Sequence, residues 1–221
     1  MPKPAALVLS SGGLHSLITA AIAAREYRVA LLHIRDGRTT AKQAGLAFDK
    51  QVAHFKPFKS WTVEAPHLRQ MALPAENTAG ASATGSDATA GLIPLRELQF
   101  FAMAAGFAKQ IHASVIMWGV HFEQKQADAV GHNIEFVQLA NALLELLSPD
   151  VAITLKTPLM GLEDQQVIEL GYQMGVPFSA SWTCQMPIDF PCMSCAACAR
   201  RIRGFRAAQL PDPIMGKPKQ P

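Results

Sequence analysis

The sequence carries little charge, and the charges it has are nearly balanced. Charged residues make up 17% of the 221 residues, and the formal net charge is only +3. A net charge this small gives no electrostatic argument for nucleic acid as a partner. Hydrophobic residues make up 49% of the chain, which excludes an intrinsically disordered protein and predicts a sizeable core.

Long apolar runs are also missing. No stretch approaches the roughly 18 residues of a transmembrane helix, and the first apolar run, residues 5–9, is too short for the core of a signal peptide. We therefore expect a cytoplasmic protein without a membrane partner. At this length one domain is the default, and we expect an α/β domain over residues 1–180 with a small C-terminal region, 181–221, packed on it.

Cysteine is absent from the first 183 residues, and all four cysteines lie within residues 184–198. In a cytosolic chain such a cluster indicates a metal site rather than disulfides. The spacing C-x7-C-x2-C-x2-C suits four thiolates around a tetrahedral Zn²⁺, and an iron–sulfur cluster is the alternative. Four thiolates leave no open coordination position, so the expected role is structural. The predicted metal ligands are Cys184, Cys192, Cys195 and Cys198.

Four arginines follow the cysteines on an expected helix: Arg200, Arg201, Arg203 and Arg206. They could neutralise thiolate charge or face solvent. A nucleic-acid-binding surface is a more specific alternative for the same residues, but the small net charge of the chain disfavours it.

A glycine-containing turn, SSGGLHS at residues 10–16, separates an apolar run from a helical pattern. A strand–turn–helix arrangement points several backbone N–H groups at one spot, and adjacent glycines let the backbone approach a ligand closely. Open α/β sheets bind ligands just beyond the carboxyl ends of their strands. No Walker lysine follows, so the turn is not a P-loop. We predict a nucleotide-phosphate site at Ser10, Ser11, Gly12, Gly13, Leu14, His15 and Ser16. The alternative is a structural turn that binds nothing.

Strands and helices alternate along the chain. Apolar runs predict strands at residues 5–9, 28–34, 61–64, 115–120 and 151–155, and helices at 14–25, 39–55, 95–111, 133–147 and 162–174. This alternation predicts βαβ units and a doubly wound, parallel five-stranded sheet. Residues 66–91 break the pattern with small polar residues and glycines, which indicates either a lid or a disordered loop. Arg96 begins the next helix, where it could face an anion or form an ordinary surface ion pair.

The glycine turn and the cysteines together resemble one family, the 7-cyano-7-deazaguanine synthases of the queuosine pathway. The turn resembles the pyrophosphate loop Ser-Gly-Gly-x-Asp-Ser of N-type ATP pyrophosphatases, and the cysteine spacing resembles the family's zinc site. Residues 92–97 (LIPLRE), 135–137 (EFV), 157–160 (TPLM) and 183–184 (TC) resemble family motifs in the same order. The resemblance covers nearly the whole chain.

The resemblance implies a PP-loop fold of the adenine nucleotide alpha hydrolase type and an ATP-dependent carbon–nitrogen ligase. Such an enzyme adenylates the carboxylate of 7-carboxy-7-deazaguanine and releases pyrophosphate. Ammonia then displaces AMP, and a second activation converts the amide to a nitrile. The implied cofactors are ATP, a structural Zn²⁺ and Mg²⁺, and the implied catalytic residues are Arg96 and His15. A homodimer is compatible with the resemblance.

Several positions depart from the family pattern. His15 stands where the family has Asp, and imidazole is a poor substitute for the oxygen ligands that Mg²⁺ prefers. A protonated His15 could instead contact phosphate, or the side chain could point into solvent beside an inactive site. Residues 35–38 (RDGR) and 129–133 (AVGHN) also differ from the family motifs, and only Asp128 could supply the carboxylate expected to recognise a guanine-like edge.

These departures leave three alternatives to the family's reaction. The chain could be a paralogue that activates another acid or nucleobase. It could also be a zinc-stabilised, nucleotide-binding pseudoenzyme. A tRNA-modifying relative is the weakest alternative, because such enzymes usually carry an added RNA-binding module for which this chain has no room.

Overall fold

The computed structural model describes residues 3–37, 40–71, 95–120 and 127–215, with the backbone alone over 127–133. Five parallel strands form one sheet in the order β3-β2-β1-β4-β5. The strands are β1 (Ala5–Leu9), β2 (Arg28–Arg35), β3 (Lys59–Glu64), β4 (Val115–Trp118) and β5 (Thr154–Lys156). The predicted doubly wound, parallel five-stranded sheet is confirmed.

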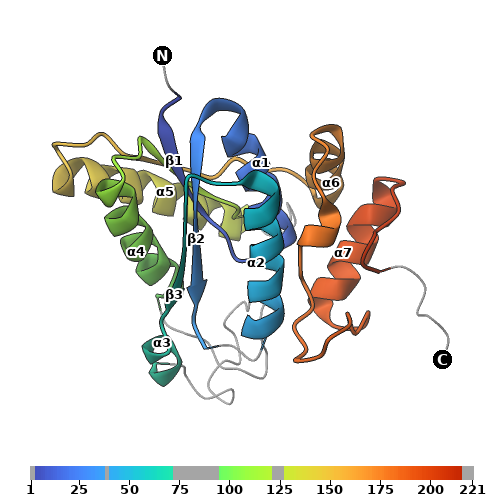
Figure 1. Cartoon of the computed structure of the whole chain (residues 1–221). Helices are drawn as coiled ribbons and strands as arrows, with labels where there is room; N and C mark the ends of the chain where they lie inside the picture. Colours follow the sequence, from blue (N-terminus) through green and yellow to red (C-terminus); the bar gives the residue numbers. More distant parts are fainter. Residues whose placement is uncertain (1–2, 38–39, 72–94, 121–126, 216–221) are drawn as a thin grey trace.

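Helices cover both faces of the sheet (Figure 1). They are α1 (Leu14–Glu26), α2 (Ala41–Phe55), α3 (His67–Gln70), α4 (Arg96–Gln110), α5 (Ala127–Leu147), α6 (Asp164–Gln173) and α7 (Ala196–Ala207). In Figure 1, α4 and α5 lie on one side of the sheet, α1 and α2 lie on the other, and α6 and α7 extend the second side outward. A short 3-10 helix, Phe178–Ala180, joins α6 to the cysteine region.

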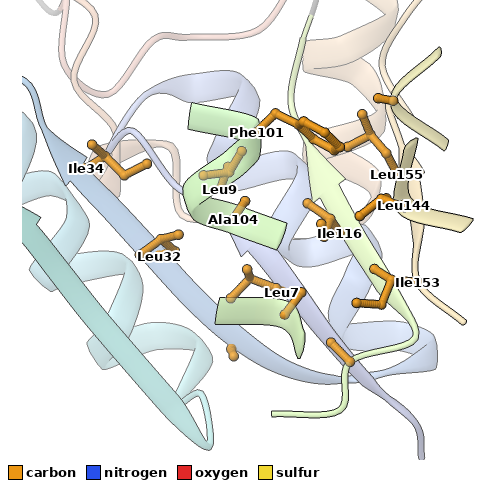
Figure 2. Packing of buried hydrophobic residues seen from close by; sticks show 14 of the residues in the cluster. Leu7, Leu9, Leu32, Ile34, Phe101, Ala104, Ile116, Leu144, Ile153 and Leu155 are labelled. Atoms are coloured by element: carbon orange, nitrogen blue, oxygen red, sulfur yellow. The ribbon is translucent and has the colours of Figure 1, made fainter. Parts of the chain in front are cut away.

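Alternate residues of the central strand supply two separate cores. All five residues of β1 are buried, as expected for a central parallel strand with helices on both faces. Leu7 belongs to one core cluster with Leu32 of β2 and Phe101 of α4 (Figure 2). Val8 points to the opposite face and packs with Phe48 of α2. Because successive side chains of a strand point to opposite faces, β1 packs against the helical layers on both sides of the sheet.

A third core joins the C-terminal region to the rest of the chain. Phe205 of α7 packs in one cluster with Leu17 of α1 and Ile168 of α6. Gly204 makes this contact close, because a Cβ at that position would lie 2.7 Å from Cδ1 of Ile168 and 3.2 Å from Cβ of Asp164. The cysteine region is thereby fixed against the helix that follows the glycine turn.

Strand register places the candidate site at one edge of the sheet. Leu9, the last residue of β1, pairs with Leu32 of β2 on one side and with Trp118 of β4 on the other. Because the strands are parallel, their carboxyl ends share that edge. The chain order reverses between β1 and β4, and such switch points are where open α/β sheets bind ligands.

Three elements differ from the sequence expectation. β5 begins at Thr154, where pairing with Val115 starts, whereas Val151 and Ile153 pack against the core without strand pairing. α5 begins at Ala127 rather than at 133, because extending an established helix is cheap even through polar residues. The expected loop over 66–91 contains the short helix α3 (His67–Gln70). The remainder of the segment for which a lid or disorder was predicted, residues 72–91, lies outside the described part. No helix among the described residues has the length and apolarity needed to span a membrane.

Candidate functional site

The glycine loop (residues 10–16) follows β1 directly and turns into α1. Gly12 has a φ of +76°, a conformation that L side chains rarely adopt. Gly13 is extended and forms the N-cap of α1. Its N–H group donates to Oγ of Ser11 at 3.2 Å, and its carbonyl accepts from the N–H group of Leu17 at 3.1 Å. The loop therefore presents the N-terminus of α1 at the carboxyl edge of the sheet.

Two glycines allow other backbone to approach this turn closely. A Cβ at Gly12 would lie 2.2 Å from the carbonyl oxygen of Ala44 in α2, and a Cβ at Gly119 would lie 2.9 Å from the carbonyl oxygen of His15. A Cβ at Gly13, in contrast, would meet only Oγ of Ser11, at 3.1 Å, and the carbonyl oxygen of Trp182, at 3.8 Å. Gly12 and Gly119 are thus required by packing, whereas Gly13 faces more open space.

The serines of the loop have different surroundings. Ser10 is buried and donates to Oε1 of Gln51 at 2.7 Å. Ser16 is also buried, and its hydroxyl donates back to the carbonyl of Gly13 at 3.0 Å. Ser11 is exposed, so among the three predicted serines its hydroxyl is the most accessible to a ligand. Leu14 is a core residue, so its backbone alone borders the loop.

Gln51 of α2 supports the loop through hydrogen bonds and was not predicted from the sequence. Its side chain is fully buried, and besides accepting from Ser10 its Nε2 donates to the carbonyls of Ala180, at 3.0 Å, and Gly13, at 3.4 Å. A signal was present: Gln51 lies three and four residues after the buried Phe48 and Ala47, which places an amide on the buried face of α2. One buried side chain thus joins the glycine loop to the segment before the cysteines.

A cavity of about 130 Å³ opens beside the loop at the ends of β1 and β2. Its lining includes Ser11, His33, Asp36, Trp182 and Thr183. Nδ1 of His33 lies 2.7 Å from the carbonyl oxygen of Ser10. The Thr183 hydroxyl is buried and has no hydrogen-bond partner within the described residues. A buried polar group of this kind indicates that a ligand or water completes the site.

Arg96, a predicted catalytic residue, contacts Asp36 of the cavity lining. Its Nε lies 3.3 Å from Oδ2 of Asp36, whose side chain is only 2% exposed. The guanidinium also lies over the ring of Phe100, 4.9 Å from its centroid. The neighbour of Arg96 is therefore a buried carboxylate from the end of β2 rather than a surface acid near Glu97.

His15 points from the first turn of α1 toward α6. Its Nε2 lies 3.9 Å from Oδ1 of Asp164, and its side chain is 27% exposed. Burial between the helices lowers the pKa of His15; Asp164 opposes this by favouring the imidazolium, and Arg200 reinforces it. Arg200 of α7 holds Asp164 through Nε, at 2.8 and 3.0 Å from the two carboxylate oxygens.

The cysteine cluster (Cys184, Cys192, Cys195 and Cys198) brings its four sulfur atoms within 4.8 Å of one another. Four sulfurs about 2.3 Å from a tetrahedral Zn²⁺ are about 3.8 Å apart, so the cluster fits such a metal with small adjustments. Backbone N–H groups point at the sulfurs: that of Cys195 donates to Sγ of Cys192 at 3.2 Å, and that of Cys198 to Sγ of Cys195 at 3.5 Å. The donor set and geometry are those of a metal-binding knuckle.

The thiols of the cluster differ in acidity. Burial raises the pKa of Cys184 and of Cys198. Desolvation acts in the same direction on Cys192, but hydrogen bonds from the backbone at Cys195 and Ser194 outweigh it and lower the pKa of Cys192 to about 6. A cation is needed to hold all four groups as thiolates at once.

Arg201 corrects the expectation for the arginines of α7. It is 3% exposed and forms an ion pair with Asp212, with Nε 2.6 Å from Oδ2. Its other nitrogens donate to Oγ of Ser181 at 2.8 Å and to the carbonyl of Phe178 at 3.3 Å. It neither faces solvent nor neutralises thiolates. It anchors the chain on both sides of the cysteine cluster instead.

The segment after the 3-10 helix connects the cluster to the loop. The N–H group of Trp182 donates to the carbonyl of Gly12 at 2.8 Å, and its indole N–H donates to the carbonyl of Cys184 at 3.0 Å. Gln43 of α2 contacts the same region by donating to Asp189 at 2.7 Å. The predicted nucleotide loop and the predicted metal site are therefore neighbours in space, although about 170 residues separate them in the sequence.

Comparison with known proteins identifies the family. The family model described as "Queuosine biosynthesis protein QueC" matches residues 5–209. The chain belongs to the QueC family. Among curated members, the 7-cyano-7-deazaguanine synthase of Chlorobium limicola is 31% identical over 216 residues, covering 95% of each chain. That of Koribacter versatilis is 29% identical over 223 residues, covering 97% of this chain and 94% of the relative.

A solved structure shows the same fold outside the QueC family. The U34-tRNA thiolase NcsA of Methanococcus maripaludis, solved with its [4Fe-4S] cluster, superimposes with a TM-score of 0.52 at 15% identity. The match covers 80% of this chain and 59% of that one. At this identity the likeness extends to the fold alone. The expected fold is thereby confirmed, and the family match confirms the resemblance to the 7-cyano-7-deazaguanine synthases.

Proposed function

We propose that this QueC-family chain is a 7-cyano-7-deazaguanine synthase that uses ATP at the glycine loop. The observation that carries the proposal is the position of that loop. It lies at the switch point of a doubly wound sheet, beside a cavity, with the N-terminus of α1 pointing outward and the cysteine cluster next to it. The names of the curated relatives supply the substrate class, and the loop supplies a site for its activation.

The proposed reaction proceeds in two activations. A carboxylate oxygen of 7-carboxy-7-deazaguanine attacks the α-phosphorus of ATP, and the bond to the β-phosphate oxygen breaks, releasing pyrophosphate. Ammonia forms a C–N bond to the acyl carbon, AMP leaves, and the amine loses a proton. The amide oxygen then attacks the α-phosphorus of a second ATP and releases a second pyrophosphate, and loss of AMP with the two remaining N–H protons gives the nitrile.

This chain's residues would bind and orient the reactants. The N–H groups of the loop and the first turn of α1 favour the phosphate oxygens, as at other helix N-termini. Arg96 supplies a fixed positive charge toward the negative charge that develops on the α-phosphate. Thr183, with its buried and unsatisfied hydroxyl, would hydrogen-bond a ligand in the cavity. These contributions are positioning and charge stabilisation.

The described residues do not form a magnesium site at the loop. Mg²⁺ prefers oxygen ligands, but His15 occupies the loop position at which the family has a carboxylate. The neighbouring carboxylates are engaged with arginines, Asp164 with Arg200 and Asp36 with Arg96. The described residues around the loop therefore leave no carboxylate free of an arginine to hold Mg²⁺.

The cysteine cluster, in contrast, fits Zn²⁺. Cys184, Cys192, Cys195 and Cys198 would hold it, and it would supply a rigid cross-link between the segment that contacts the loop and α7. With four sulfur ligands the site is closed, so its role is structural.

The deciding experiment offers the full, metal-loaded chain ATP, ammonium and 7-carboxy-7-deazaguanine. We expect pyrophosphate release and a product with the mass of the nitrile. Gly13→Ala should weaken both, because its Cβ would lie 3.1 Å from Oγ of Ser11, the most accessible hydroxyl of the loop. Gly45→Ala is the matched control, since a Cβ there meets nothing within 4 Å.

The same assay separates the alternatives. Pyrophosphate release with a different acid, and none with 7-carboxy-7-deazaguanine, would identify a paralogue with another substrate. Binding of ATP without pyrophosphate release for any acid would identify a pseudoenzyme. Either result would overturn the proposal.

A further inference from the structure

Three charged or titratable side chains from three helices meet at the start of α1. His15 of α1 faces Asp164, the first residue of α6, and Asp164 is held by Arg200 of α7. Gly204 permits the close approach of α7 to α6 that this requires, because a Cβ there would lie 3.2 Å from Cβ of Asp164. These three side chains do not line the cavity beside the loop. They adjoin the glycine loop because His15 is one of its residues.

The surroundings of His15 favour the neutral imidazole in the free protein. Its burial disfavours the charged form and places its pKa below the usual value, the carboxylate of Asp164 acts in the opposite direction, and the guanidinium groups of Arg200 and Arg201 add to the lowering. The charge of Arg201 is itself balanced by Asp212. In the free state, one anion near His15, Asp164, favours the imidazolium, and two cations on α7, Arg200 and Arg201, disfavour it.

A bound polyphosphate would change this balance. It would place several negative charges at the N-terminus of α1, within a few ångströms of the imidazole. An opposite charge at that distance favours the protonated form of histidine. The imidazolium would then lie between two anions, the polyphosphate and Asp164, and its N–H groups could satisfy both.

We propose that a polyphosphate binds the glycine loop together with one proton, which His15 accepts from solvent and which Asp164 helps to hold. In this assignment Asp164 is a positioning residue: Arg200 fixes its carboxylate, and the carboxylate fixes the ring of His15. The proton adds to the unprotonated ring nitrogen and neutralises part of the phosphate charge at a loop whose described neighbouring carboxylates, Asp36 and Asp164, are paired with arginines. The proposal rests on the proposed nucleotide site.

The test is calorimetric titration of the full, metal-loaded chain with pyrophosphate in two buffers of different ionisation enthalpy near pH 7.5. The dependence of the measured heat on the buffer gives the number of protons taken up. We expect that number to be larger for the parent than for His15→Gln, by up to one proton. The affinity of the parent should rise by up to about tenfold per unit decrease in pH, until the phosphate itself protonates. His54→Gln, on the exposed face of α2, is the matched control and should behave like the parent.

A second variant separates positioning from structure. Asp164→Asn keeps the shape of the side chain, and α6 keeps its N-cap at Glu163. The pKa of His15, followed by NMR in the free protein, should fall further when the carboxylate is removed, and the proton uptake should decrease. Asp164→Glu should restore part of both. A purely structural role would change the melting temperature alone and leave the pKa of His15 unchanged.

The outcomes distinguish the two proposals. Pyrophosphate binding by the parent with the same proton uptake as His15→Gln would overturn this inference and leave the nucleotide site intact. An unchanged His15 pKa in Asp164→Asn would remove the role of Asp164. Absence of any polyphosphate or ATP binding by the parent would overturn both the inference and the proposed function.

Discussion

The cysteine cluster and the glycine loop are built in different ways. The cluster takes all its ligands from residues 184–198 and orients them with its own backbone N–H groups. The loop takes only its turn from residues 10–16, and side chains from α2, α6 and α7 set its surroundings. A site made from one short segment can be predicted from the sequence. For a site supported by distant residues, only the central motif can be predicted.

The sharpest test of this contrast is removal of one ligand from the cluster. In Cys198→Ser the chain should lose its bound metal, and the C-terminal region should unfold, because structural Zn²⁺ contributes about 10 kcal/mol or more to such regions. Elemental analysis and thermal unfolding measure both effects. Met193→Ala, an exposed residue in the same segment, is the matched control. Retention of a full equivalent of metal in Cys198→Ser, or iron and sulfide in the parent, would contradict the zinc assignment.

The next largest effect is expected at Gly12. Gly12→Ala places a Cβ 2.2 Å from the carbonyl oxygen of Ala44 at a positive φ, so strain and overlap should cost about 3 kcal/mol. This corresponds to a melting temperature lower by roughly 6–12 °C. Gly13→Ala should melt close to the parent and yet bind ATP more weakly. Equal stability of the two variants would show that the contact between Gly12 and α2 does not constrain the loop.

Gln51 tests the support of the loop by a distant residue. Gln51→Leu keeps a side chain of similar size but removes the hydrogen-bond partner of the Ser10 hydroxyl and of the Ala180 carbonyl. This loss should lower the free energy of unfolding by about 2 kcal/mol. We expect a melting temperature lower by roughly 4–8 °C and a weaker affinity for ATP. Gln43→Leu removes an amide from the exposed part of the same helix and should change neither quantity by a comparable amount. An unchanged ATP affinity in Gln51→Leu would show that the loop keeps its geometry without this residue.

The smallest expected effect is on stability as a function of pH. The pKa of His15 is lowered in the folded chain, so the unfolded chain binds more protons as the pH falls below about 6.5, the usual pKa of histidine. The contribution of His15 to stability is therefore complete above that pH and is lost as the pH falls through the lowered value. In urea unfolding between pH 7.5 and 5.5, the parent should lose more stability than His15→Gln. Parallel curves would show that the folded environment of His15 does not disfavour its charge.

Most of the fold could be predicted because it depends on local patterns. β1 and β2 are apolar runs bounded by turn residues, and the structure confirms them within one residue. β5 is shifted because an apolar run does not reveal where pairing begins: Ile153 is buried, but the ladder starts at Thr154. Packing and pairing are separate events that a single sequence does not distinguish.

The candidate site was predictable only in its central motifs. The cysteines and the glycines carry their geometry in their spacing. The partners of the site do not: Asp164 lies about 150 residues from His15, and Asp212 makes Arg201 a buried anchor although the sequence of α7 suggests an exposed basic face. Which acid meets which base is decided by the crossing of α6 and α7, and that crossing depends on Gly204.

The contact between Gly12 and α2 bears on how sequences of this family are interpreted. A glycine is needed at position 12 for the main chain of α2 to fit beside the turn, whether or not a nucleotide ever binds there. A descendant that had lost its catalytic activity would therefore still be under selection to keep this glycine. Persistence of the Ser-Gly-Gly signature therefore shows that the scaffold is inherited. Evidence of a working enzyme has to come from positions such as 13, where a Cβ would meet no backbone atom closer than 3.8 Å.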